Sequence, residues 1–287
     1  MLELLSITID SGYARRLWAH EGNTVFVDLE IEGKRERQAA RDTVVSAHSM
    51  EDAGRLARLP DRGPLLVRTN PAGAGGIEEA RELEALGVDR VMLPMFRSRA
   101  EVEAVVEALD AGGGSPPRLS LLAETVDAVE RLEEIVDGQP GWVDHVHIGL
   151  NDLSLERGTA FLFEPVASGE IGELARRVRG LGRRFGFGGV GMPGEGLVSA
   201  EQILGEHVRV GSECVILARS FHRRLPGGDA SALSDGLGRV RRWEAHWREA
   251  SRDALEENHT ALRLAIESVL ASMGGVGEEK PAGRRSS

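Results

Sequence analysis

Two acidic residues are candidate ligands for a metal ion. Glu124 ends the apolar run Leu121–Glu124, and Asp152 ends the run that begins at His145. If the two runs form neighbouring parallel strands, about 4.8 Å apart, their carboxylates converge on one point. Two protein carboxylates, with water and substrate completing the shell, suit Mg²⁺ or Mn²⁺. The pair therefore predicts a divalent-metal site, with capping of the following helices as the alternative.

A cation is expected near this pair. Arg68 follows the apolar run Leu65–Val67, and a buried guanidinium is costly without an anionic partner. Its planar fork matches a carboxylate at two points, so a substrate carboxylate at the metal is one candidate partner. A salt bridge to Asp28 or Glu30, on the preceding strand, is the other.

Other side chains fall at the same ends of apolar runs. The candidates for substrate contacts are Asn70, Pro94 and Asn151. His48 ends the loop that follows the Asp28 strand, and a neutral imidazole is a suitable base near pH 7. A histidine bonded only to backbone is the alternative interpretation. His145 and His147 lie two apart in one strand and are interpreted as core residues.

The lysines exclude another chemistry. Lys34 follows a strand in a charged loop, and Lys280 lies near the C-terminus; no other lysine is present. A Schiff-base aldolase needs a lysine that projects into a desolvated pocket. Neither residue is placed for that, so carbanion chemistry here would need another electron sink, of which a metal ion is the simplest.

The elements that must position these residues form a repeating pattern. Short apolar or β-branched runs alternate with helical patterns, as in βα units, and eight of them predict a (β/α)₈ TIM barrel. The expected strands are Leu4–Thr8, Thr24–Glu30, Leu65–Asn70, Arg90–Met95, Leu119–Thr125, His145–Asp152, Arg184–Val190 and Cys214–Ser220. Ser49, Ser98 and Ser199 each precede an acid or amide by three residues, which predicts helix caps. Helical periodicity is expected in Ala100–Leu109 and Val126–Val136.

The expected domain organisation is a catalytic barrel over residues 1–228, a helical extension over 229–273 and a disordered tail over 274–287. The extension carries apolar points at Trp243, Trp247, Leu255, Leu262 and Ile266, on more helix than barrel closure needs. It is expected either to cover the bottom of the barrel or to pack on a neighbouring subunit. A homo-oligomer is therefore predicted.

Composition narrows the classes of molecule that the protein is expected to bind and the compartment in which it is expected to act. The net charge of −11 disfavours nonspecific nucleic-acid binding, which needs a basic surface. No apolar run reaches the ~20 residues of a membrane span, and the N-terminus lacks the features of a signal peptide, so a cytoplasmic protein is expected. Cys214 is the only cysteine; it cannot form an internal disulfide and is interpreted as a buried structural thiol.

Several of these motifs, taken together in order and spacing, resemble the HpcH/HpaI aldolase and citrate lyase β-subunit family. The matching segments are Val25–Glu30, Leu66–Asn70, Val91–Met95, Leu121–Thr125 and His147–Ser154, within about Val25 to Phe221. The resemblance implies that Glu124 and Asp152 are the metal ligands and that Arg68 holds the carboxylate and enolate oxygen of a 2-oxo acid. It also implies that Asp28 and Glu30 match an acidic pair that holds metal-bound water in the lyase branch, and that C-terminal helices exchange between subunits.

The resemblance is to a divergent branch. Aldolases of the family read Glu-His-Gly after the second strand, where the histidine is the base, but this chain reads Glu30-Ile-Glu-Gly33. His48 is therefore the substitute candidate. The expected activity is that of a class II aldolase or lyase acting on a 2-oxo acid and an aldehyde. An acyl-CoA ester lyase, an enzyme that uses phosphoenolpyruvate and a noncatalytic ligand-binding barrel are the alternatives.

Overall fold

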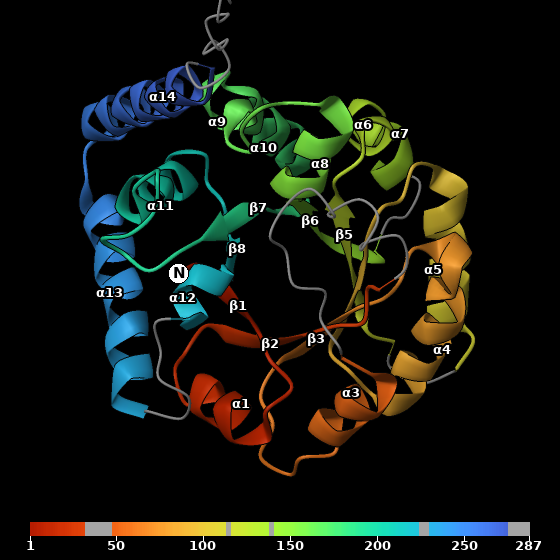
Figure 1. The fold of residues 1–287 in the computed structure, drawn as a ribbon. Helices are drawn as coiled ribbons and strands as arrows, with labels where there is room; N and C mark the ends of the chain where they lie inside the picture. The colour runs from red at the N-terminus through yellow and green to blue at the C-terminus, as the bar shows by residue number, and fades with distance from the viewer. Residues whose placement is uncertain (32–47, 113–115, 138–140, 224–229, 275–287) are drawn as a thin grey trace, which may run out of the picture.

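The computed structural model describes residues 1–31, 48–112, 116–137, 141–223 and 230–274. Eight parallel strands, in chain order, close into a barrel (Figure 1). They are β1 (Glu3–Ile7), β2 (Asn23–Asp28), β3 (Leu65–Arg68), β4 (Arg90–Leu93), β5 (Arg118–Ala123), β6 (Val143–Ile148), β7 (Arg184–Val190) and β8 (Cys214–Leu217). The predicted (β/α)₈ architecture is confirmed.

The strands bury both of their faces. Because successive side chains of a strand point to opposite sides, Val25 and Val27 of β2 join the core between the strands and the outer helices, whereas Phe26 between them points into the barrel. The interior cluster contains Leu5, Phe26, Leu66, Met92, Leu122 and Cys214. This double burial explains why the strands read as nearly continuous apolar runs.

Helices surround the barrel (Figure 1). They are α1 (Ser11–Trp18), α3 (Met50–Ala57), α4 (Gly76–Leu86), α5 (Arg99–Asp110), α6 (Val126–Glu130), α7 (Leu132–Asp137), α8 (Leu150–Arg157), α9 (Glu164–Ala167), α10 (Glu170–Gly180), α11 (Ala200–Arg209) and α12 (Arg219–Arg223), with a 3₁₀ turn, η1, at Ala72–Ala74. The predicted caps are confirmed: Ser49 and Ser98 form complete capping boxes, and Ser199 accepts a hydrogen bond from the backbone of Gln202.

Two sequence predictions need correction. Several expected strands ran too far at their C-terminal ends; the sixth was expected to end at Asp152, but β6 ends at Ile148. Polar residues that begin the following loop or helix had been counted as strand. The helix expected over Val126–Val136 is broken at Arg131, which leaves two short helices.

Two long helices follow the barrel, α13 (Ala230–Glu249) and α14 (Arg252–Gly274). Both contact α11, and α14 also contacts α9, all in the same chain (Figure 1). Leu262 and Ile266 of α14 are fully buried there. Helix α13 reaches the N-terminal end of the barrel, where its residue Glu244 accepts a hydrogen bond from the backbone N–H of Leu2 at 2.5 Å.

Within the described ranges, no helix combines the length and the apolar character needed to cross a membrane. Lys34, residues 224–228 at the end of the expected barrel domain, and residues 275–287 of the expected tail lie outside the described residues. Cys214 is buried, as predicted.

Candidate active site at the C-terminal end of the barrel

Arg68 is held by acids from the neighbouring strand. It ends β3 beside Asp28, the last residue of β2, and its Nε and Nη2 atoms donate to the two carboxylate oxygens of Asp28, each at 2.8 Å. Its Nη1 lies 3.3 Å from Oε2 of Glu30. The salt bridge considered as an alternative from the sequence is thus present, and it fixes the plane of the guanidinium.

Arg68 remains positively charged although the residue is buried. Burial alone would lower the pKa of the guanidinium, but the charges of Asp28, Glu30 and Glu124 hold it well above its usual range. Glu124 therefore lies close enough to interact electrostatically with Arg68. A permanently charged donor is thus present at this end of the barrel, next to one of the two predicted metal ligands.

Glu124 follows β5 directly and is only 2% exposed. The next residue, Thr125, caps α6 by accepting from the backbone of Ala128 and donates to the carbonyl oxygen of Phe96 at 2.8 Å. On the other side, a Cβ atom added to Gly149 would lie 2.6 Å from Cβ and from Oε2 of Glu124. Glycine at 149 therefore leaves the room that the Glu124 carboxylate occupies.

Asp152 lies in a helix, and the prediction that it ends a strand is wrong. It belongs to the first turn of α8, is 7% exposed, and follows the N-cap residue Gly149. Since Gly149 also contacts Glu124, both acids lie at the same end of α8. The positive end of a helix dipole favours carboxylates at this position, so the local backbone supports two charged acids near each other.

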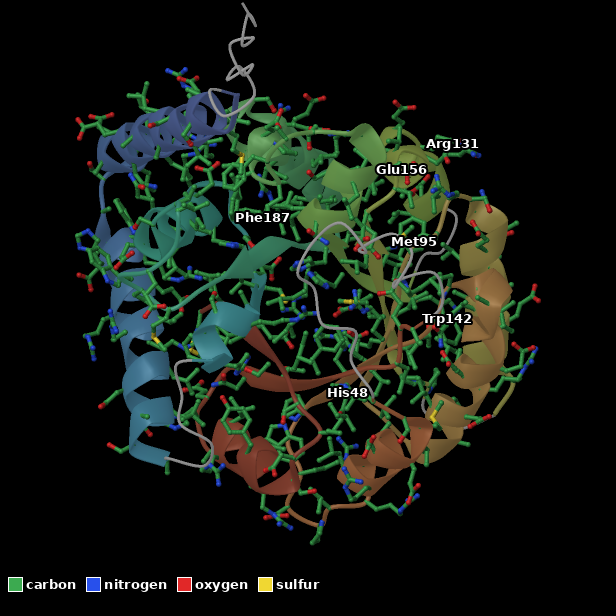
Figure 2. All side chains as sticks on the ribbon, viewed as in Figure 1. His48, Met95, Arg131, Trp142, Glu156 and Phe187 are labelled. Carbon is green, nitrogen blue, oxygen red and sulfur yellow. The ribbon has the colours of Figure 1, made fainter. Side chains whose placement is uncertain are left out.

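A rim salt-bridge network holds the helices that follow β5 and β6. Arg97 donates to Asp127 of α6 at 2.9 Å and to both carboxylate oxygens of Glu156 of α8. Glu156 lies one turn after Asp152, so the network ties the Asp152 helix to the loop after β4. Figure 2 labels Glu156 and also Met95 of that loop.

Met95 was missed by the sequence analysis. Met95 has a φ of 53°, and among the residues that the structure describes it is the one non-glycine residue with a positive φ. Such backbone strain persists where surrounding structure enforces it, often at functional sites. Methionine has no preference for this conformation, so no local signal could have revealed it.

The remaining substrate candidates differ in their surroundings. Asn70 accepts from the backbone N–H of Ile31 at 2.9 Å and donates to Glu79 at 2.7 Å, so its amide joins the segment after β2 to α4. Pro94 is buried directly after β4, and Asn151 is half-buried in the first turn of α8. Contact of these three with a substrate stays a prediction.

His48 lies between the barrel and α3 (Figure 2). Its Nδ1 atom accepts from the backbone N–H of Asp28 at 3.0 Å. A neutral imidazole in this arrangement carries its proton on Nε2. The ring is thus next to Asp28, and Nδ1 must release the Asp28 backbone before it can take a proton from a substrate; a role for His48 as base stays a prediction.

The donors at this end suit a hard divalent cation. The buried carboxyl groups at the C-terminal ends of the strands are Asp28, Glu30, Glu124 and Asp152, and Arg68 is the buried guanidinium among them. Oxygen ligands are what Mg²⁺ and Mn²⁺ prefer. That Glu124 and Asp152 hold such an ion stays a prediction.

Comparison with known proteins gives a family match. The sequence model of the HpcH/HpaI aldolase/citrate lyase family matches residues 13–166. No curated protein matches.

Solved structures share the fold at low identity. An HpcH/HpaI aldolase from Desulfitobacterium hafniense DCB-2 is 16% identical, with a TM-score of 0.57 over 79% of this chain and 95% of that one. A citrate lyase from Burkholderia xenovorans LB400 is 14% identical, with a TM-score of 0.60 over 94% and 93%. An HpcH/HpaI aldolase/citrate lyase family protein from Burkholderia cenocepacia J2315 is 13% identical, with a TM-score of 0.56 over 84% and 95%.

Proposed function

Because the chain belongs to the HpcH/HpaI aldolase/citrate lyase family, we propose that it is a class II aldolase or lyase that depends on a divalent metal. Families of this name comprise carbon–carbon lyases and aldolases, which act on small molecules. The proposed reaction forms or cleaves a carbon–carbon bond through the enolate of a pyruvate-type 2-oxo acid, with an aldehyde as the second substrate. Mg²⁺ or Mn²⁺ would be held by Glu124 and Asp152.

The observation that carries this proposal is the position of Arg68. Its guanidinium is buried, remains charged, and lies beside Asp28, Glu30 and Glu124 at the catalytic end of the barrel. In TIM-barrel enzymes this end carries the active site. A charged guanidinium fixed at this end, beside a predicted metal ligand, suits the carboxylate of a 2-oxo acid.

The roles of the chain's own residues follow from their chemistry. When bound, the metal would act as a Lewis acid on the carboxylate and carbonyl oxygens of the 2-oxo acid. Arg68 would donate to the same oxygen, which gains negative charge as the bond breaks, and so would stabilise the transition state more than the ground state. Asp28 and Glu30 keep the guanidinium plane in place, because their carboxylates contact its nitrogen atoms.

We keep His48 as the candidate base, with Asn70, Pro94 and Asn151 as candidate substrate contacts. The contact of His48 with the Asp28 backbone supports a position close to Arg68. Replacing His48 with glutamine should slow proton removal while leaving metal affinity unchanged. Unchanged exchange rates in that variant would move the base to another residue.

Enolisation is the direct test of the proposed activity. With Mg²⁺ or Mn²⁺, the protein should exchange the methyl protons of pyruvate with D₂O, as followed by NMR, and chelation should stop the exchange. A noncatalytic ligand-binding barrel would bind pyruvate without exchanging its protons. Absence of exchange with pyruvate, together with cleavage of an acyl-CoA ester, would instead favour the acyl-CoA lyase alternative.

A homo-oligomer is also proposed. Leu264 and Met273 of α14 are exposed in the single chain, at 54% and 45%, whereas Leu262 and Ile266 pack on its own barrel. Sedimentation of the full chain should give an oligomer, and replacing Leu264 with glutamate should weaken it. A full-length chain that sediments as a monomer would contradict the prediction.

A further inference from the structure

We propose that the interior of the barrel holds a second metal site, built from His145, His147 and Cys214, which takes a thiophilic transition-metal ion such as Zn²⁺ or Cu⁺. One ligand atom from each of these residues lies within 4.8 Å of the others. All three side chains are completely buried. This site is independent of the proposed reaction, which uses oxygen ligands at the end of the barrel.

Strand register brings the three residues together. His147 of β6 pairs with Gly186 of β7, and Gly186 pairs in turn with Cys214 of β8. Gly186 thus lies between the two ligands without a side chain of its own. A Cβ atom there would lie 2.6 Å from Nδ1 of His147 and 2.9 Å from Nε2 of His145. The glycine therefore preserves a small space toward which both nitrogen atoms are directed.

The hydrogen bonds of the two imidazoles leave these nitrogen atoms available. Nε2 of His147 lies 2.9 Å from the carbonyl oxygen of Gly188 and must donate to it, so its Nδ1 carries a lone pair. Nδ1 of His145 lies 3.3 Å from Oγ of Ser120 and can donate to it, which leaves a lone pair on Nε2. Within the described residues, neither of the two facing nitrogens has a hydrogen-bond partner. Metal-ligating histidines typically donate their other N–H to a carbonyl or another oxygen in this way.

The protonation states are consistent with ligation. Burial lowers the pKa of His145 well below its usual range, and lowers that of His147 to about 4, so both rings are neutral. Burial raises the pKa of the Cys214 thiol. A metal ion would displace the thiol proton, and the resulting thiolate would reduce the net charge carried into the interior. Arg90 and Arg184, which lie near Cys214, are already paired with Glu3.

The donor set selects the metal class. One thiolate and two imidazoles suit Zn²⁺ or Cu⁺, and no carboxylate belongs to this cluster to favour Mg²⁺ or Mn²⁺. Tetrahedral zinc holds neighbouring ligand atoms roughly 3.5 Å apart, given its bond lengths. Small side-chain rotations would bring three atoms from within 4.8 Å to that spacing. A bound ion would tie β6 to β8 across β7.

Metal content of the intact protein tests the proposal. The full chain is produced in medium supplemented with zinc or with copper, passed through a desalting column with EDTA to strip exposed oxygen-bound ions, and analysed by mass spectrometry. We expect about one equivalent of zinc or copper per chain, and the better-retained metal is the one that the site binds more tightly. Cys214→Ser should lose it. Met92→Leu, a change in the same interior cluster, and Glu124→Gln, at the other site, should retain it.

A second measurement does not depend on the folding of a variant. Wild-type protein unfolded and refolded with Co²⁺ should show a thiolate-to-cobalt charge-transfer band in the near ultraviolet. A wild type without metal under all three conditions would overturn the proposal and leave the space to a water molecule. Equal metal content in wild type and Cys214→Ser, or its loss in Glu124→Gln, would also overturn it, because the ion would then lie elsewhere.

Discussion

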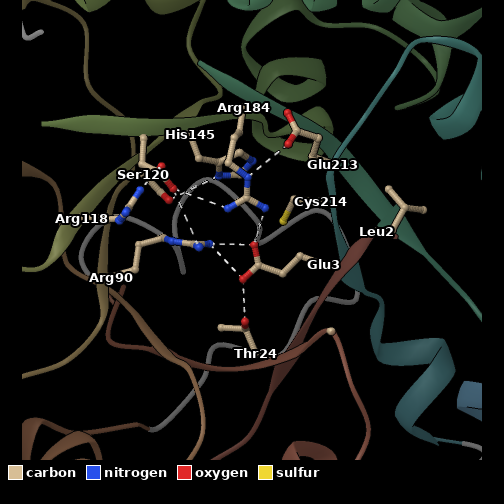
Figure 3. A network of polar contacts seen from close by, with 12 residues as sticks. Leu2, Glu3, Thr24, Arg90, Arg118, Ser120, His145, Arg184, Glu213 and Cys214 are labelled. Atoms are coloured by element: carbon tan, nitrogen blue, oxygen red, sulfur yellow. Dashed lines mark hydrogen bonds and ion pairs between the residues drawn. The ribbon is translucent and has the colours of Figure 1, made fainter. Parts of the chain in front are cut away.

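The two ends of the barrel carry charge in different proportions. At the N-terminal end, a lower network (Figure 3) joins three carboxylates to three guanidiniums; its members are Glu3, Asp144, Glu213, Arg90, Arg118 and Arg184. Glu3 is its centre, and it also accepts from Thr24 at 2.5 Å. At the C-terminal end, buried acids outnumber the one buried guanidinium among the described residues.

This difference separates stability from function. Each charge of the lower network has an opposite charge within reach, so the network needs no ligand and its contribution is to folding. At the C-terminal end, Asp28, Glu30 and Glu124 all lie near Arg68, and a cluster of oxygen donors is what a site for a divalent cation requires. The same division is typical of TIM barrels, where the strand tops are catalytic and the bottoms stabilise. The following predictions test it, from the largest expected effect to the smallest.

Removal of either proposed metal ligand should have the largest effect. Glu124→Gln and Asp152→Asn keep size and shape but remove charge, so metal-dependent activity should fall to background while the melting temperature stays close to that of wild type. Mn²⁺ affinity and pyruvate proton exchange are the measurements. Wild-type metal affinity in either variant would remove that residue from the site.

Arg68→Lys should be the next most severe change. Lysine keeps the charge but loses the planar fork, so kcat should drop on the order of 10²-fold, as when one oxyanion donor is removed. Steady-state kinetics and thermal unfolding are measured together. Near-normal turnover with a lowered melting temperature would mean that Arg68 only forms a structural salt bridge with Asp28. The charged residues at both ends of the barrel would then serve stability alone.

The opposite pattern is expected in the lower network. Glu3→Gln leaves Arg90 and Arg184 without their shared carboxylate, and the side chain of Glu3 is 14% exposed. The free energy of unfolding should fall by about 1–3 kcal/mol, between the values for exposed and buried pairs, while kcat and KM should not change. Urea midpoints at constant slope give the stability. A loss of activity without a loss of stability would contradict the division.

A smaller effect should follow pH. Burial alone would raise the pKa of Glu3, but Arg90, Thr24 and Arg184 together lower it below its usual value of 4.5. A carboxyl group with a lowered folded-state pKa stabilises the protein above its unfolded-state pKa, and this stabilisation is lost as the pH falls through the folded-state value. The stability difference between wild type and Glu3→Gln should therefore shrink below about pH 4.5. A constant difference down to pH 2 would rule out Glu3 ionisation as its source.

Local sequence patterns predicted much of the fold. The alternation of apolar runs with helical segments predicted all eight strands, because parallel strands buried on both faces read as continuous apolar runs. Ser49 and Ser98 predicted helix starts correctly, since a capping box depends on residues only three positions apart. Several strands were predicted to end too late in the chain, because a polar residue after an apolar run does not reveal whether it continues the strand or begins a loop or helix.

For the site, the sequence by itself determined the residue types available: two acids and an arginine that follow apolar runs, and no lysine placed for a Schiff base. Only the tertiary structure decided their partners. Arg68 meets Asp28 because β2 and β3 are in register. Gly149 makes room for Glu124 because its backbone N–H donates to the carbonyl oxygen of Ala123, at the end of β5. The convergence of His145, His147 and Cys214 likewise depends on a glycine in the strand between them. Such contacts join residues far apart in the chain, and their geometry arises from barrel closure, which no local pattern encodes.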